Sequence, residues 1–212
     1  MHRLESFDKF SLEYDKWFES HETEYKLELN AIKTLIPHEG KGIEIGAGTG
    51  RFTQPLGIAL GIEPSKSMSD IATSRGVNII AGRAESLPIE SSSYDYALFV
   101  TTDCFLDTPA DAYKEARRIL KQGGFILIGM IDKKSTLGKK YESMKHKSRF
   151  YKDATFHSVQ EIQAELEKTG FSNFEYAQAI LPGDHSTGLK PGVVQGFGIG
   201  SFVVLRAQKN GT

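Results

Sequence analysis

A glycine-rich segment around residue 46 holds the residues whose types and spacing most clearly predict chemistry. The sequence EIGAGTG spans residues 44–50 and follows a short apolar run. Glycines after a strand let a ligand lie against the backbone where any Cβ atom would collide with it. A dinucleotide-binding loop has glycines at its first, third and sixth positions, but here they fall at the first, third and fifth, and the sixth is Arg51. No Gly-Lys-Ser/Thr follows, so a phosphate-binding P-loop is excluded as well.

A second candidate is Glu63, which ends another short apolar run 19 residues after Glu44. An ionised carboxylate accepts hydrogen bonds and a ribose offers two hydroxyl donors, so a glutamate at this place suits a nucleoside. A solvent-exposed glutamate at the end of a strand is the alternative interpretation. Together the two segments predict a nucleoside-containing ligand more strongly than either does alone.

The elements that position these residues alternate between strand and helix. The sequence predicts four helical regions. The first ends before Pro37, the second begins after the cap residue Ser65, the third follows Pro109, and the fourth begins at a capping box that starts with Ser158. The expected strands cover residues 42–45, 58–62, 77–80, 96–100, 125–131, 174–180 and 202–207. No helix pattern separates the last two, so we expect them to pair as an antiparallel edge hairpin.

This alternation predicts an α/β protein with a Rossmann-like, doubly wound, mostly parallel sheet and an antiparallel C-terminal edge. We expect a single domain over residues 1–212, divided into an N-terminal helical lid (1–37), a ligand-binding core (38–131), a lid insertion after the fifth strand (132–157) and a C-terminal part (158–212). Ligands of such sheets bind beyond the carboxyl ends of the strands, where both lids would lie.

Composition narrows the class of protein. Lys and Arg number 26 against 27 Asp and Glu, so a net charge of −1 gives no overall attraction to nucleic acid or membrane. The single cysteine, Cys104, excludes an internal disulfide, and no metal site is expected. The first residues are charged rather than an apolar signal core, and no apolar run reaches membrane-spanning length. A cytoplasmic protein, monomeric or homodimeric, is expected.

Five segments in the right order resemble the class I S-adenosylmethionine-dependent methyltransferases, and most closely the type-11 branch that includes quinone-biosynthesis enzymes. They are GIEIGAGTG (42–50), GIEPS (61–65), GRAESLP (82–88), YDYALFV (94–100) and EARRILKQGG (115–124). YDKWF at 14–18 also resembles the aromatic N-terminal segment of that branch. The resemblance covers nearly the whole chain and implies S-adenosyl-L-methionine as cofactor, S-adenosyl-L-homocysteine as product and a small-molecule methyl acceptor as partner.

Carried over residue by residue, the resemblance implies a set of cofactor contacts. The methionine part would lie on the glycine loop, the ribose on the end of the second strand, the adenine on the next helix and loop, and the methyl group beside the fourth strand. The residues implied for the methionine part are Glu44, Gly46, Ala47, Gly48 and Gly50, and those for the ribose are Glu63 and Pro64. The residues implied for the adenine are Met68, Ala84 and Glu85, and the residue beside the methyl group is Thr101. Arg83 departs from the family, which often has an aspartate there, because arginine cannot accept a hydrogen bond from the adenine amine. Glu85 or a backbone carbonyl would take that role.

The acceptor site is less defined by the sequence. No general base is evident, so the catalytic residues stay unassigned, and His21 is the best histidine candidate. Two interpretations are open for the aromatic residues Tyr14, Trp17 and Phe18: they line the acceptor pocket, or they pack as ordinary helix residues. The same two interpretations apply to Tyr141. Cys104 either lines the pocket or fills the core. The acceptor and its nucleophilic atom, whether N, O, S or C, are open.

The two lid segments carry opposite charge. Residues 5–28 hold eight acids and three lysines, and residues 133–152 hold eight basic residues and one acid, Glu142. We predict that they meet over the cofactor and enclose the acceptor. The basic segment also allows a nucleic-acid (RNA) methyltransferase, although few stacking aromatics there argue against it. A non-catalytic S-adenosylmethionine-binding protein is a further alternative, and a nicotinamide-dependent oxidoreductase is disfavoured by the glycine spacing.

Overall fold

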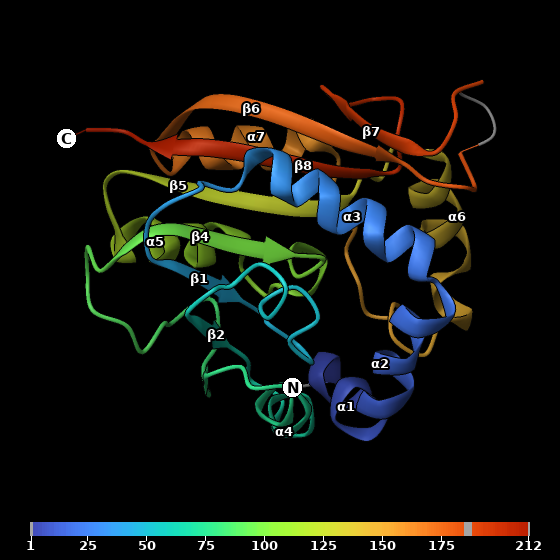
Figure 1. Ribbon diagram of the computed structural model, residues 1–212, viewed down its shortest axis with the longest axis horizontal. Helices are drawn as coiled ribbons and strands as arrows, with labels where there is room; N and C mark the ends of the chain where they lie inside the picture. The colour runs from blue at the N-terminus through green and yellow to red at the C-terminus, as the bar shows by residue number, and fades with distance from the viewer. Residues whose placement is uncertain (1, 185–187, 212) are drawn as a thin grey trace.

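A computed structural model describes residues 2–184 and 188–211, which form one sheet covered by helices on both faces (Figure 1). Three helices come first: α1 (His2–Lys9), α2 (Ser11–Ser20) and α3 (Glu22–Leu35). The later helices are α4 (Lys66–Ser74), α5 (Pro109–Ile119), α6 (Thr136–Met144) and α7 (Val159–Lys168), with 3₁₀ turns η1 (Asp103–Phe105) and η2 (Lys145–Lys147). The strands are β1 (Gly42–Ile45), β2 (Leu60–Ile62), β3 (Ile79–Ile80), β4 (Tyr94–Val100), β5 (Leu120–Ile131), β6 (Phe171–Ile180), β7 (Gly192–Gln195) and β8 (Phe202–Lys209).

The sheet has the strand order β3-β2-β1-β4-β5-β8-β6-β7. β1 to β5 are parallel, and Ile43 of β1 pairs with Leu60 of β2 on one side and Ala97 of β4 on the other. β8 runs antiparallel to both β5 and β6. The expected mostly parallel Rossmann-like sheet with antiparallel C-terminal strands is therefore confirmed.

Alternate residues of the central strands pack into two separate cores, one on each face of the sheet. In β4, Ala97 and Phe99 face the core that α5 and α7 complete, whereas Leu98 and Val100 face the core that α2 and α3 complete. Figure 1 shows α3 lying across one face and α5 and α7 behind the other. Burial on both faces explains why these strands read as nearly continuous apolar runs.

Two helix starts follow directly from the sequence. The Ser65 hydroxyl accepts a hydrogen bond from the Met68 N–H and caps α4, which ends shortly before Gly76, a residue with φ of +84°. Ser158 and Glu161 form the expected capping box at the start of α7. These caps fix where α4 and α7 leave the sheet.

Two expectations about the sheet are wrong in detail. The expected antiparallel pairing of the last two strands is present between β6 and β8, but β8 lies inside the sheet between β5 and β6 and not at its edge, because it is apolar and buried from Phe202 to Leu205. The edge is β7, a four-residue strand that pairs with β6 and has no apolar alternation in the sequence. β5 begins at Leu120, five residues before the expected strand of residues 125–131, because the backbone pairs there with Tyr94.

The expected N-terminal lid divides into two parts. α3 covers the sheet, with Leu29, Ala31, Ile32 and Leu35 buried in the core, so it is a core helix. α1 and α2 instead rise beyond the carboxyl ends of the strands, near α4 (Figure 1). α6 and η2 form within the 132–157 insertion and approach the same end of the sheet.

Candidate active site

A cavity lies beyond the carboxyl ends of β1, β2 and β4, and we call it the glycine-loop pocket. Eight of the residues that the sequence nominates for the cofactor line it: Gly46, Gly48, Glu63, Pro64, Met68, Ala84, Glu85 and Thr101. It is also lined by Phe7, Gly82, Arg83, Val100, Thr102, Phe105, Leu106 and Asp107. The pocket thus collects residues from four of the five segments behind the resemblance.

The glycine loop needs its glycines for two different reasons. Gly46 has a φ of +76°, and a Cβ atom there would lie 2.4 Å from Oγ1 of Thr102. Gly48 has a φ of +54°, but its Cβ atom would meet only the ring of Tyr14, at 4.0 Å. Space in front of Gly48 is therefore left for a ligand that lies on bare backbone.

Glu63 is buried at the end of β2 and orients the glycine loop. Its two carboxylate oxygens accept hydrogen bonds from the Gly48 N–H at 2.9 Å and the Ser65 N–H at 2.8 Å. Burial raises the pKa of Glu63, and those two hydrogen bonds oppose the shift. Each oxygen retains a second lone pair, so the carboxylate can also accept hydrogen bonds from a vicinal diol.

The opposite side of the glycine-loop pocket is built around Arg83. Its guanidinium forms an ion pair with Asp107, and the Asp107 N–H donates to Glu85 at 2.9 Å. Met68 and Ala84 are buried beside them. Glu85 lines the pocket beside Arg83, which pairs with it at 3.6 Å, and its role toward the adenine amine stays a prediction.

Three nominated residues lie outside the lining of the pocket. Glu44 is buried beneath the loop, where it accepts a hydrogen bond from Thr53. Burial raises the pKa of Glu44 to about 8, Thr53 opposes this, and Glu63 adds to it. A Cβ atom on Gly50 would meet Val77 and Ala72, so this glycine packs the loop onto α4. The Cβ atom of Ala47 faces Gly61 in the same way.

A second cavity, which we call the aromatic chamber, has a volume of about 340 Å³. It contains five of the six residues that the sequence nominates for the acceptor: Tyr14, Trp17, Phe18, His21 and Tyr141. Phe52, Phe150 and Tyr151 add further rings, and Glu24, Glu28, Lys140 and Asp184 add charged groups. Its volume falls in the usual range for small-molecule sites.

The sixth nominated residue, Cys104, does not line the aromatic chamber. Its side chain is buried against Ala154 and Phe156, and its thiol lies 3.5 Å from the Thr101 carbonyl oxygen. Cys104 therefore fills a small core beneath the chamber.

Tyr14 and Thr101 line both cavities. Burial raises the pKa of the Tyr14 phenol, as do Glu28 and Glu63, so the phenol is neutral. Thr101 has a φ of +48°, a backbone conformation that is rare outside glycine, and it follows directly on β4. The shared wall is where a ligand in one cavity would approach a ligand in the other.

The two oppositely charged segments, residues 5–28 and 133–152, contact each other beside these cavities. Arg149 forms an ion pair with Glu13, and its guanidinium lies 4.3 Å from the ring centre of Phe10. Phe150 packs against Phe7 at 5.6 Å and against Tyr14 at 5.7 Å between ring centres. Rings provide most of this contact, so charge contributes less than the opposite signs of the two segments suggest.

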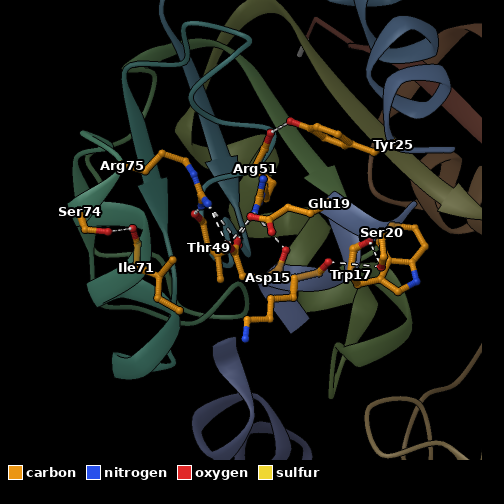
Figure 2. Close-up of polar contacts among 11 residues, drawn as sticks. Asp15, Trp17, Glu19, Ser20, Tyr25, Thr49, Arg51, Ile71, Ser74 and Arg75 are labelled. Atoms are coloured by element: carbon orange, nitrogen blue, oxygen red, sulfur yellow. Dashed lines mark hydrogen bonds and ion pairs between the residues drawn. The ribbon is translucent and has the colours of Figure 1, made fainter. Parts of the chain in front are cut away.

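A half-buried ion cluster attaches α2 to the glycine loop (Figure 2). Asp15 pairs with Arg51, which follows the loop, and with Arg75 at the end of α4. Partial burial alone would raise the pKa of Asp15, but hydrogen bonds from Arg51, Thr49 and Arg75 lower it to about 2. Glu19 also pairs with Arg51, and Tyr25 donates to the Arg51 carbonyl oxygen.

Several residues of the cavities escaped the sequence analysis. One had a readable signal: Glu28 lies three residues after Tyr25 and four before Ile32, on the apolar side of its helix. Phe7, Phe105 and Asp107 come from turns and a short helix that carry no such pattern. Among residues 2–184 and 188–211, no group of three metal-ligating side chains converges, and no helix is long and apolar enough to cross a membrane.

Comparison with known proteins gives one family. A family model described as a methyltransferase domain, Methyltransf_11, matches residues 43–128. A Thermotoga maritima crystal structure, described as a SAM-dependent methyltransferase and possible histamine N-methyltransferase, is 45% identical with a TM-score of 0.93 and covers 99% of this chain and 100% of its own. An uncharacterised Methanocaldococcus jannaschii protein is 44% identical over 96% of this chain and 98% of its own length.

A more distant relative is demethylmenaquinone methyltransferase of Staphylococcus aureus, which is 30% identical over 60% of this chain and 58% of its own length. The sheet and the glycine-loop pocket define a S-adenosylmethionine-dependent methyltransferase. Within that class, the chain belongs to the class I methyltransferases of type 11. Its cofactor is S-adenosylmethionine, and methyl transfer converts this to S-adenosylhomocysteine.

Proposed function

We propose that the protein transfers the methyl group of S-adenosylmethionine to a small molecule bound in the aromatic chamber. The observation that carries this proposal is the wall that Tyr14 and Thr101 share between the two cavities. A cofactor on the glycine loop and an acceptor among the aromatic rings would meet only there.

The pocket fits the cofactor on its own geometry. Gly48 leaves its front open for a ligand on the backbone, and Glu63 presents a carboxylate with free lone pairs beside it. Met68 and Ala84 supply an apolar surface for a flat ring. We assign Glu63 to the ribose, Met68 and Ala84 to the adenine, and Gly46 and Gly48 to the methionine part.

When bound, the cofactor supplies an electrophilic methyl carbon. The residues of the chain supply alignment and a site without bulk water. Tyr14 and Thr101 border the point of transfer, while Phe7 and Phe150 close it from solvent.

Two of the eight basic residues in the 133–152 segment are engaged within the protein, which weakens the alternative of an RNA substrate. Arg149 is engaged by Glu13 and Phe10, and Lys145 by Glu142. These two cations are engaged within the protein, whereas the other six basic residues of the segment are exposed, so the assay below includes total RNA.

A thermal-shift experiment tests the proposal. S-adenosylmethionine and S-adenosylhomocysteine should raise the melting temperature because they bind only the folded state, and NAD should not. A methyl-transfer assay over pools of small metabolites and over total RNA then identifies the acceptor class. Stabilisation by NAD alone, or transfer to RNA alone, would contradict the proposal.

A further inference from the structure

The named relatives differ in the acceptors they are described with, demethylmenaquinone in one and possibly histamine in another. The acceptor of this chain therefore has to be inferred from its own aromatic chamber. The inference below rests on the proposed function and concerns the same site.

Glu28 is a charged residue on the apolar side of α3, inside the aromatic chamber. Its side chain is only 5% exposed, and its helix neighbours Leu29 and Ile32 are buried in the core. In the described part of the chain, no hydrogen bond or ion pair reaches its carboxylate. A buried ionised carboxylate without a partner is costly, so this side chain is suited to a partner that comes from outside.

The groups that face Glu28 do not neutralise it. Glu24 lies beside it on α3, and the phenols of Tyr14, Tyr141 and Tyr151 approach from α2, α6 and the segment after η2. Burial, with a smaller contribution from Glu24, raises the pKa of Glu28 to about 8. No cation that the structure describes is close enough to lower the pKa of Glu28.

The remaining charged groups of the aromatic chamber do not change this balance. Asp184 is satisfied by the N–H groups of Leu181 and Ser201. Lys140 lines the chamber but forms no ion pair with Glu28. The chamber is therefore negative when Glu28 ionises.

The rings around Glu28 favour the same kind of ligand. Tyr141 and Tyr151 stack at 5.1 Å between ring centres, and Trp17 stacks on His21 at 4.5 Å. Aromatic faces attract cations, whereas an anionic acceptor such as a phenolate or carboxylate would be repelled by Glu28 and Glu24. An amine enters as a cation and must lose a proton before it can be methylated.

We propose that the acceptor is a small amine and that Glu28 binds its ammonium group and takes one proton from it. The ammonium becomes a neutral amine as the Glu28 carboxylate becomes a carboxylic acid. The nitrogen lone pair then forms the N–C bond to the methyl carbon while the S–C bond breaks and its electron pair stays on sulfur. The products are a methylated ammonium ion and the neutral thioether S-adenosylhomocysteine.

Binding can be measured directly because Trp17 is the single tryptophan of the chain and lines the aromatic chamber. Protein loaded with S-adenosylhomocysteine is titrated with 2-phenylethylamine, 3-phenylpropylamine and hexylamine, each paired with its alcohol, and tryptophan fluorescence is followed. The variants are Glu28→Gln, which removes the charge at constant shape, and Glu28→Asp, which keeps it. Glu22→Gln is the matched control, since Glu22 is an exposed residue of the same helix.

The wild-type protein should bind at least one amine about tenfold or more tightly than its alcohol. Glu28→Gln should lose that preference, Glu28→Asp should keep part of it, and Glu22→Gln should retain it fully. If every amine binds no better than its alcohol, or if Glu28→Gln keeps the preference, the proposal is overturned. If a Glu28 variant does not fold, the comparison of each amine with its alcohol in the wild-type protein still tests whether the chamber prefers an amine.

Methyl transfer separates binding of charge from removal of a proton. When the substrate is an amine that the wild-type enzyme methylates, Glu28→Gln should lower kcat by about 10²-fold or more. Part of that loss should be recovered at high pH, where the amine is already neutral. A loss confined to KM at every pH would contradict the proton-transfer role. Transfer to a non-amine acceptor would overturn this inference alone, whereas failure to bind S-adenosylhomocysteine would overturn the proposed function.

Discussion

Asp15 and Arg51 form a two-point ion pair, with Nε to Oδ1 at 2.8 Å and Nη2 to Oδ2 at 2.7 Å. Asp15 belongs to α2, and Arg51 directly follows the glycine loop (Figure 2). Both side chains are largely buried, and planar bidentate pairs of this kind are stronger and more directional than single contacts. The helix that carries Tyr14 and Trp17 is thereby fixed to the loop that lines the glycine-loop pocket.

Replacing Asp15 with alanine should lower the free energy of unfolding by about 1–3 kcal/mol, because Arg51 and Arg75 lose their partner in a partly buried place. Denaturant unfolding measures the change. Glu19→Gln is the control, since Glu19 is exposed and its pair with Arg51 should contribute less than about 1 kcal/mol. Equal losses in the two variants would show that the buried pair has no special weight.

Acid should remove the Asp15 contribution in a defined range. The pKa of Asp15 is lowered from 3.8 to about 2 in the folded protein. Its stabilisation is therefore complete above pH 3.8 and is lost as the pH falls toward 2, amounting to about 2 kcal/mol at about 1.4 kcal/mol per pKa unit. The stability difference between the wild-type protein and Asp15→Asn should shrink over this range; a constant difference would contradict the assignment.

Glu63→Ala should weaken the binding of S-adenosylhomocysteine by about 1–3 kcal/mol, measured by calorimetry, because charge-assisted hydrogen bonds to the ribose are lost. The variant should also lose some stability, since Glu63 holds the N–H groups of Gly48 and Ser65. The exposed Glu90→Ala provides a matched change outside the pocket. Unchanged affinity in folded Glu63→Ala would exclude Glu63 from the cofactor site.

Glu44 should destabilise the protein at alkaline pH. Burial raises the pKa of Glu44 from 4.5 to about 8, so the folded state holds a proton that the unfolded state releases. The contribution of Glu44 to stability is thus present below pH 4.5 and falls as the pH rises through 8. Glu44→Gln keeps an acceptor for Thr53, so its stability relative to the wild-type protein should rise between pH 5 and 8 and then level off. A relative stability that does not change with pH would refute the burial argument.

Much of the fold was predictable because its signals are local. The glycine loop, the Ser65 cap and the Ser158 capping box each lie within a few residues of sequence and define where strands and helices end. The position of β8 between β5 and β6 was not predictable in this way. It depends on which apolar strands pair across more than 70 residues of chain.

The residues of the candidate site also differ in whether local sequence signals or long-range contacts place them. Residues at strand ends, such as Gly46 and Glu63, could be nominated because the sheet topology places them. Phe7 and Phe150 come from segments that are distant in sequence and meet only in the folded protein. Glu28 can be identified only by noticing a charged residue on the apolar side of its helix. The roles of these residues remain predictions that the experiments above can test.

The packing of α1 over the glycine-loop pocket has a kinetic consequence. Phe7 contacts Phe105 at 5.0 Å between ring centres, and Ser65 donates a hydrogen bond to Asp8 at 2.6 Å, so α1 is held against residues of the glycine-loop pocket and its border. Because Phe7 also packs on Phe150, a movement of α1 would loosen the walls of both cavities together. We expect exchange of S-adenosylmethionine for S-adenosylhomocysteine to require this movement, so that helix opening and not methyl transfer sets the limit on turnover.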